Sequence, residues 1–310
     1  MSEALVDLEK RVESLAGLRS VVRTMKALSA ASIRPYEAAV EALGDYARTV
    51  ELALHVVVRE TDAGPGPADP GEAATAAVIF GSDHGLCGRF NEEIAAFAEA
   101  HLERAGIARA DRRFVAVGAR VADRLARTGS EPERTFPLPG SAAGVAATVQ
   151  RLLLQVDAWQ TGDGTARALL FYNRHLGGSR FRPTAHALLP IDLRRFRSLP
   201  EGRWPSRSLP TFSMPADRLL GRLLRQWMFV SLFRACAESQ ASEHGSRLAA
   251  MQAAQRNLEE RGETLRRALR RARQEAVTAE LMDVLSGFEA TEPEGSDAED
   301  GTSTGAREAR

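Results

Sequence analysis

The feature that most constrains the fold is a repeating pattern of small and apolar residues near the C-terminus. Its positions are separated alternately by three and four residues, which is the spacing of a coiled-coil seam. A helix over residues 211–287 would be on the order of 110 Å long at about 1.5 Å per residue, far longer than a globular domain needs. The pattern therefore predicts a long shaft helix. Its positions are Leu248, Met251, Gln255, Leu258, Gly262, Leu265, Leu269, Ala272, Ala276 and Ala279.

Residues 1–59 carry the same pattern at the other end of the chain, beginning with Leu5, Leu8 and Val12. Pro35 is expected to kink or perturb this helix, because proline lacks the backbone donor. Two long helices at opposite ends of one chain predict that the termini pair as an antiparallel coiled coil. The alternative is that both helices simply pack over the domain between them.

Between these helices, residues 75–195 alternate strand-like and helix-like stretches. Such alternation predicts a parallel or mixed sheet flanked by helices. The predicted fold class is α+β: a long antiparallel coiled coil of the N- and C-terminal helices with an inserted α/β (Rossmann-like) domain. Linkers at 60–74 and 196–210 would join these parts, and residues 288–310 would form a disordered acidic tail. The strand-like stretches are 76–80, 113–117, 168–172 and 184–189, and the helix-like ones are 91–105, 119–127 and 142–158.

Composition excludes several classes of protein. Hydrophobic residues make up 44% of the chain and charged residues 26%, which favours a folded protein over a disordered one. The formal net charge of +0 argues against a dedicated nucleic-acid binder. The two cysteines, Cys87 and Cys236, are too few for a disulfide scaffold. No stretch reaches the ~20 apolar residues that span a bilayer, so we expect a soluble, cytoplasmic-type chain.

The stretch that most resembles a site is IFGSDHGLCGRFN at residues 79–91. A strand, a glycine turn and a helix N-terminus can cradle a phosphate, and a cysteine with a positioned base can act as a nucleophile. However, the spacing G-x-x-x-G-x-x-G is neither the dinucleotide fingerprint nor the P-loop. His84 is only a candidate base for Cys87. We therefore favour a structural turn, with a ligand or catalytic role as the alternative. The residues of this turn are Gly81, Asp83, Gly85, Cys87 and Gly88.

Several stretches of the chain carry a family resemblance. The stretch VVRTMKALSAASIR occupies residues 21–34, and GSDHGLCGRFN occupies residues 81–91 of the predicted α/β domain. The stretches ASEHGSRLAAMQAAQRN and RRARQEAVTAELMDVLSG belong to the C-terminal helix. Weaker similarity runs through LFYNRH at 170–175 and HALLPI at 186–191. In this order, the stretches resemble the gamma subunit of F-type ATP synthases, whose middle-domain signature usually reads S-D-R-G-L-C-G-G-F-N.

This resemblance implies a role in a rotary machine. In that family the coiled coil lies in the central cavity of a hexamer of alternating alpha and beta subunits. The α/β domain sits below it, with the epsilon subunit, on the membrane-embedded c-ring. Rotation of the shaft opens and closes the catalytic sites on beta, so that gamma couples ion flow to ATP chemistry. The partners implied are therefore alpha, beta, epsilon and the c-ring, with no nucleic acid.

The same resemblance implies a non-catalytic, peripheral subunit on the cytoplasmic face of a bacterial inner membrane. It implies no catalytic, cofactor-binding or metal-ligating residue and no cofactor. It does imply contacts between the shaft and the beta subunits, whose acidic loops would complement the arginine-rich stretch at 264–280. The alternative for this stretch is an ordinary solvated basic face. The positions that match the family's contacts with beta are Met25, Lys26, Arg273, Gln274, Thr278 and Glu280.

The chain also departs from the family's usual pattern. His84 and Arg89 replace the usual Arg and Gly of the middle signature. Such departures are compatible with a divergent bacterial branch, such as the alternate N-type ATPases. Two other functions remain as alternatives: a coiled-coil adaptor with no rotary role, and a nucleotide-binding enzyme built on the middle domain.

Overall fold

A computed structural model describes residues 3–61, 74–161, 165–198, 204, 207–208 and 210–289. Most of the predicted linker at 60–74, part of that at 196–210 and residues 290–310 of the predicted tail lie outside the described residues. The chain divides into two units. We name them the sheet unit (Ser20–Arg256) and the terminal unit (Met1–Arg19 with Asn257–Arg310).

The sheet unit contains one five-stranded mixed sheet. Its strands are β1 (Ala74–Phe80), β2 (Arg112–Val117), β3 (Arg134–Phe136), β4 (Thr165–His175) and β5 (Phe181–Leu189). The spatial order is β3-β2-β1-β4-β5, with β5 antiparallel to β4 and the other neighbours parallel. The prediction of a parallel or mixed sheet is confirmed, and the sheet is mixed because β4 and β5 form a hairpin. The three-residue strand β3 was missed, since so short a segment has no readable alternation.

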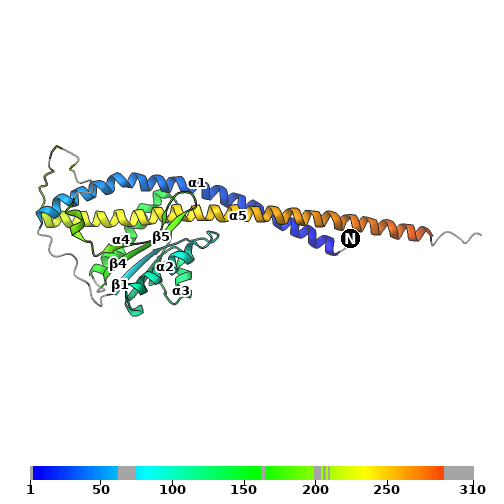
Figure 1. The fold of residues 1–310 in the computed structure, drawn as a ribbon, viewed down its shortest axis with the longest axis horizontal. Coiled ribbons are helices and arrows are strands. Elements are labelled where there is room, and N and C mark those ends of the chain that lie inside the picture. Colours follow the sequence, from blue (N-terminus) through cyan, green and yellow to red (C-terminus); the bar gives the residue numbers. More distant parts are fainter. Residues whose placement is uncertain are drawn as a thin grey trace, which may run out of the picture. The chain divides into compact units, whose positions relative to one another are not determined.

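Both faces of this sheet are covered by helices (Figure 1), namely α2 (Phe90–Arg104), α3 (Ala119–Arg127), α4 (Val145–Thr161) and α5 (Ala216–Glu289). Successive side chains of a strand point to opposite faces, and β1 follows this rule. Ala77 and Ile79 pack among residues of α2 and α3, whereas Ala76 and Val78 pack among residues of α4 and α5. Burial on both faces explains why β1 reads as one continuous apolar run.

Two long helices, α1 (Glu3–Glu60) and α5, pair in an antiparallel manner within the sheet unit. The residue numbers on α5 fall as those of their partners on α1 rise, which defines the antiparallel direction. The predicted direction of the coiled coil is confirmed here. The contacts are Lys26 Nζ to Gln255 Oε1 at 3.0 Å, Tyr36 stacked on His244 with ring centroids 5.6 Å apart, and Tyr46 Oη to Gln226 Oε1 at 2.7 Å.

The terminal unit shows the same antiparallel pairing. Arg19 Nη2 lies 3.4 Å from Glu259 Oε1, and Arg273 Nη2 lies 2.6 Å from Glu9 Oε1. We expected the seam residues Leu258 and Leu265 to be buried, but both are only half-buried. Leu248, within the sheet unit, is also half-buried. A seam between two helices covers one side of each leucine and leaves the other side exposed.

The boundaries of the long helices differ slightly from the prediction. Helix α5 begins at Ala216 rather than at residue 211. Pro215 cannot donate a backbone hydrogen bond, but its carbonyl accepts one from Leu219 N at 3.1 Å, so it caps the first turn. Helix α1 continues through Pro35.

One residue of the predicted 196–210 linker belongs to the core instead. Phe196 is 4% exposed, and its ring packs edge-on against Trp227 with the centroids 5.2 Å apart. Its carbonyl oxygen lies 2.8 Å from His55 Nδ1 of α1. The boundary was wrong because an isolated aromatic residue between arginines shows no periodicity that marks it as buried.

Candidate functional site

The glycine turn begins where β1 ends, and its geometry depends on close packing at Gly81. A Cβ added to Gly81 would lie 2.3 Å from Val121 Cβ, so a side chain there would collide with α3. Ser82 N donates to Asn91 Oδ1 at 2.9 Å, and Asn91 Nδ2 donates to Ser82 Oγ at 2.8 Å. This reciprocal pair ties the turn to the first residues of α2.

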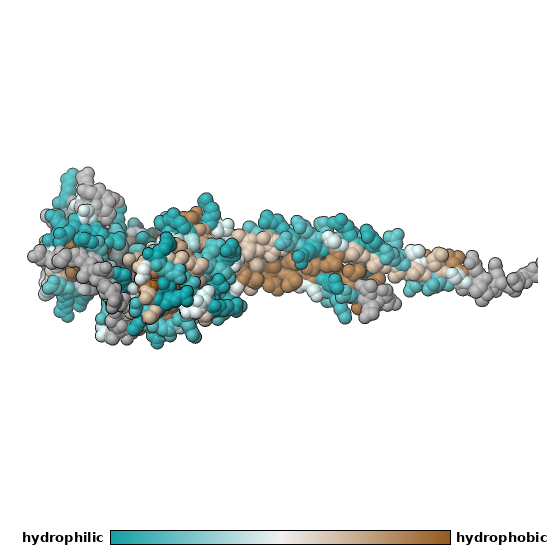
Figure 2. Space-filling model, turned by 60° about the horizontal axis from the view of Figure 1, so that its bottom comes forward, coloured by the Kyte–Doolittle hydropathy of each residue, from teal (hydrophilic) through white to brown (hydrophobic). Residues whose placement is uncertain are grey.

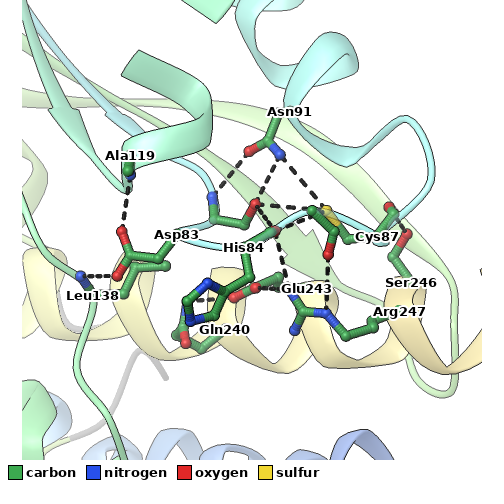
Figure 3. A network of polar contacts seen from close by, with 12 residues as sticks. Asp83, His84, Cys87, Asn91, Ala119, Leu138, Gln240, Glu243, Ser246 and Arg247 are labelled. Carbon is green, nitrogen blue, oxygen red and sulfur yellow. Dashed lines mark hydrogen bonds and ion pairs between the residues drawn. The ribbon is translucent and has the colours of Figure 1, made fainter. Parts of the chain in front are cut away.

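Asp83 connects the turn to two further segments. Its carboxylate accepts the backbone N–H of Ala119 at 2.8 Å and that of Leu138 at 2.9 Å (Figure 3). Both oxygens of the carboxylate are thus used to hold the start of α3 and the loop after β3. Asp83 acts as a structural acceptor in this geometry.

The side chain of Cys87 is not placed for nucleophilic chemistry. Cys87 is 2% exposed, and burial raises the pKa of its thiol, so the reactive thiolate is disfavoured. Its Sγ lies 3.6 Å from Ser82 Oγ and 3.6 Å from Asn91 Nδ2. No contact joins it to a ring nitrogen of His84 among the described hydrogen bonds, in which His84 takes part through its carbonyl.

Helix α5 supplies the other half of the polar network shown in Figure 3. Ser246 Oγ donates to Cys87 O at 2.7 Å, and Arg247 Nη2 donates to His84 O at 3.2 Å. The guanidinium of Arg247 also pairs with the Glu243 carboxylate, whose other oxygen accepts from Gln240 Nε2 at 2.9 Å. The turn is therefore fastened to α5 through its backbone carbonyls.

A cavity of about 380 Å³ lies beside this network, between α1, the turn and α5. Asp83, Glu243 and Arg247 are among its lining groups. Burial lowers the pKa of His244, another lining residue, to about 4, so its ring is neutral at physiological pH. In the part of the chain that the structure describes, no group of three or more His, Cys, Asp or Glu side chains could hold a metal ion.

The predicted turn residues lie in one turn, but the structure requires glycine at only some of the glycine positions. Gly81 is required by packing, and Gly88 by its φ of +61°. Nothing lies within 4 Å of a Cβ placed on Gly85. Sequence reasoning missed the partners on α5, although ASEHGSRLAAMQAAQRN contains some of them. The residues missed are Asn91, Gln240, Glu243, Ser246 and Arg247.

The predicted contact residues of the shaft lie on helix surfaces. In the sheet unit, Met25 is 37% exposed and Lys26 is held by Gln255. In the terminal unit, Arg273 forms its ion pair with Glu9, and Thr278 Oγ1 donates to the carbonyl of Gln274 at 2.9 Å. Gln274, Thr278 and Glu280 are exposed.

Exposed apolar side chains gather on the long helices (Figure 2). Large exposed apolar patches on a protein usually mark a surface that another molecule covers. In the sheet unit, Val21, Met25 and Leu28 follow intervals of four and three, which places them on one face of α1. The exposed apolar residues of the long helices are Val21, Met25, Leu28 and Tyr46 in the sheet unit, and Leu18, Val277, Leu281, Met282, Val284 and Leu285 in the terminal unit.

Comparisons with known proteins agree with this architecture. The family model described as ATP synthase matches residues 4–291. The ATP synthase gamma chain of Salinibacter ruber is 30% identical over 312 residues, which cover 94% of this chain and 99% of that protein. The gamma chain of Desulforamulus reducens is 29% identical over 294 residues, covering 92% and 98% respectively.

Solved structures show the same fold. The rotor of the Euglena gracilis mitochondrial ATP synthase matches with a TM-score of 0.63 at 17% identity, over 88% of this chain and 99% of that chain. The central stalk of the Tetrahymena thermophila mitochondrial ATP synthase matches with a TM-score of 0.53 at 20% identity, over 76% and 99%. Since the family match spans both long helices and the whole sheet, the chain belongs to the ATP synthase gamma-chain family.

Proposed function

We propose that this chain, as the gamma subunit and central-stalk rotor of an ATP synthase, contributes no catalytic group of its own and couples ATP chemistry on other subunits to ion flow. The observation that carries the proposal is the family match over residues 4–291, which includes both long helices as well as the sheet. Because the match covers the shaft and the sheet together, it favours the rotor over a coiled-coil adaptor and over a nucleotide-binding enzyme built on the middle domain.

The geometry of the glycine turn supports the non-catalytic part of the proposal. Asp83 is occupied by two backbone donors, and the Cys87 thiol is buried with a raised pKa. A nucleotide-binding enzyme would require a free anion cradle or an activated nucleophile in this turn. The polar groups of the turn instead form hydrogen bonds within the chain.

The surfaces of the long helices support the rotor part. The partners we propose are the alpha and beta subunits around the shaft, with the epsilon subunit and the c-ring at the α/β domain. Exposed apolar residues and a dense run of arginines at 266–273 give the helices a surface suited to a sleeve of other subunits. Within this surface, the residues proposed to contact beta are Met25, Lys26, Arg273, Gln274, Thr278 and Glu280.

We place the chain at the cytoplasmic face of a bacterial inner membrane, attached through its partners. Among the described helices, none has both the length and the apolar character that crossing a bilayer requires. Attachment through a membrane-embedded ring is consistent with that finding.

Co-purification and turnover test the proposal together. A tagged form of the chain, expressed with its neighbouring subunits, should be recovered with alpha and beta in a proportion of one to three of each. The purified chain alone should neither bind nor hydrolyse ATP, whereas the assembled complex should hydrolyse it. Recovery without alpha and beta would contradict the rotor assignment, and ATP turnover by the chain alone would contradict its non-catalytic role.

A further inference from the structure

Helix α5 changes character where it passes the glycine turn. From Met228 to Cys236 its buried side chains are mostly apolar members of the core, with Ser231 as the polar exception. From Glu238 to Arg247 its buried side chains are instead mostly polar. Burial of polar groups is costly unless they are hydrogen-bonded. Glu238 Oε2 and Ser239 Oγ have no hydrogen-bond partner within the described residues, whereas the buried polar residues from Gln240 onward have specific partners. The buried polar residues are Glu238, Ser239, Gln240, Ser242, Glu243 and Arg247.

These partners come from two separate segments of the α/β domain. The turn supplies the carbonyls of His84 and Cys87 to Arg247 and Ser246. The end of β4 supplies the Asn173 carbonyl, which accepts from Ser242 Oγ at 2.9 Å. Three side chains on two successive turns of α5, those of Ser242, Ser246 and Arg247, thus reach backbone carbonyls of the α/β domain.

A third segment fits α5 by shape. Gly245 faces the turn between β4 and β5, and a Cβ on it would lie 2.3 Å from the carbonyl oxygen of Gly178. The missing side chain of Gly245 therefore leaves a space on α5 beside the polar contacts, and the turn between β4 and β5 occupies this space. Sliding α5 by one residue would place a side chain where the carbonyl now lies.

Helix α1 is held at the same level. The hydroxyl of Tyr36 donates to the Pro139 carbonyl at 3.3 Å, and Glu37 Oε1 lies 2.9 Å from His175 Nε2. The Tyr36 ring also stacks on His244 of α5. Both shaft helices are thus fixed to the α/β domain beside one another.

We propose that residues 242–247 of α5 form a torque-bearing joint between the shaft and the α/β domain. Apolar packing is non-directional and can slide at little cost, whereas the hydrogen bonds from Ser242, Ser246 and Arg247 to the domain are directional. Leaving any of them unmade in the buried site is penalised, so the joint has one favoured register and one favoured angle. Ser246 and Arg247 are positioning residues that keep the helix from slipping against the domain under load, and Glu243 holds the Arg247 guanidinium in place from within α5.

The use of backbone acceptors has a further consequence for the turn. Every residue has a carbonyl, so these contacts do not use the side chains of His84 and Cys87, although Gly81 and Gly88 still set the path of the turn. His84 and Arg89, which depart from the family's usual signature, leave these carbonyl contacts in place. The joint depends instead on the identity of residues on α5.

The proposal of a torque-bearing joint rests on the proposed rotor function. Its test uses the assembled ATP synthase in membrane vesicles. The variant is Glu243→Gln with Arg247→Met, which removes both charges together and leaves neither one buried alone. The matched control is Asp7→Asn with Arg11→Met, because Asp7 and Arg11 form an ion pair of the same i,i+4 spacing on an exposed face. For each, ATP hydrolysis and ATP-driven ion pumping are measured while the opposing ion gradient is raised.

For the joint variant, we expect hydrolysis near the wild-type rate, and ions pumped per ATP lower by about threefold to tenfold at the highest gradient. The deficit should grow with the gradient, because slip increases with torque. A residue that only stabilises the fold would lower the amount of complex without changing this ratio. If the number of ions pumped per ATP is the same for the variant, the control and the wild type at every gradient, the proposed joint is disproved.

If the double variant does not assemble, Ser246→Ala decides the question, since it removes one hydroxyl and its single bond to Cys87 O. A smaller but gradient-dependent deficit supports the joint, and a wild-type ratio overturns it. Failure of the rotor function itself would be visible separately. In that case the wild-type complex would lack alpha and beta or would hydrolyse ATP without pumping.

Discussion

Burial shifts the pKa values of two neighbouring residues near the glycine turn, Glu243 and His244, in opposite directions. Burial lowers the pKa of His244 to about 4, and burial raises the pKa of Glu243 although Arg247 opposes that change. The neutral His244 ring therefore contributes stability that is fully present above its ordinary pKa of 6.5 and is lost as the pH falls toward 4. Glu243 acts in the opposite direction, since its contribution is present at low pH and is lost as the pH rises through its raised pKa.

The first prediction isolates His244 with the substitution His244→Phe. Phenylalanine keeps a ring against Tyr36, and it sacrifices no hydrogen bond at Nδ1, which is buried without a partner. Between pH 7 and pH 4, wild type should lose up to about 3 kcal/mol of unfolding free energy relative to the variant. Urea unfolding of both chains across this range measures the difference, in which the contribution of Glu243 cancels. A difference that does not change with pH would show that His244 is not held neutral by the fold.

The second prediction concerns Cys87. Since its thiol serves packing, Cys87→Ser should leave assembly and ATP turnover by the complex within about twofold of wild type and destabilise the chain by roughly 1 kcal/mol. Hydrolysis by the assembled complex is the measurement. A loss of turnover by orders of magnitude in fully assembled complex would return the turn to the set of candidate catalytic sites.

At the scale of elements, the close approach of α5 to the β4–β5 turn sets a third prediction. Gly245→Ala should destabilise the chain by about 1–3 kcal/mol, because its Cβ would meet a backbone carbonyl that cannot move alone. Gly221→Ala is the matched control on the same helix, where nothing lies within 4 Å of the added atom. It should stabilise by roughly 0.5–1 kcal/mol through helix propensity. Urea unfolding should therefore give effects of opposite sign, and stabilisation by both would disprove the contact.

The elements themselves could largely be predicted from local patterns. Heptad spacing predicts α1 and α5, and apolar runs predict β1, β2 and β4, because each pattern is set by neighbours in sequence. The polar residues of α5 that meet the turn could not be predicted in the same way. Gln240, Glu243 and Arg247 resemble a solvated helix face, and only the fold brings the turn over them. Phe196 was missed for the same reason, since its partner Trp227 is distant in sequence.

At the scale of the whole molecule, function depends on how the shaft meets its partners. The structure gives Arg273 a partner within the chain, Glu9, at 2.6 Å. Both side chains are substantially exposed, so this ion pair is worth only about 0.2–1 kcal/mol and can exchange readily for another acceptor. Arg273 can thus form its proposed contact with an acidic loop of beta in some shaft orientations and return to Glu9 in others.

The last prediction tests that exchange with Arg273→Ala combined with Gln274→Ala. Alanine preserves helix propensity, so the complex should assemble, while ATP-driven ion pumping should fall severalfold because contacts with beta are lost. Glu9→Gln is the matched control, since it breaks the same ion pair but leaves Arg273 available to beta, and it should pump at the wild-type rate. Pumping into vesicles is measured beside ATP hydrolysis for all three complexes. A loss reproduced by Glu9→Gln would assign the effect to the pair within the shaft, and wild-type pumping by the double variant would show that these two residues do not grip beta.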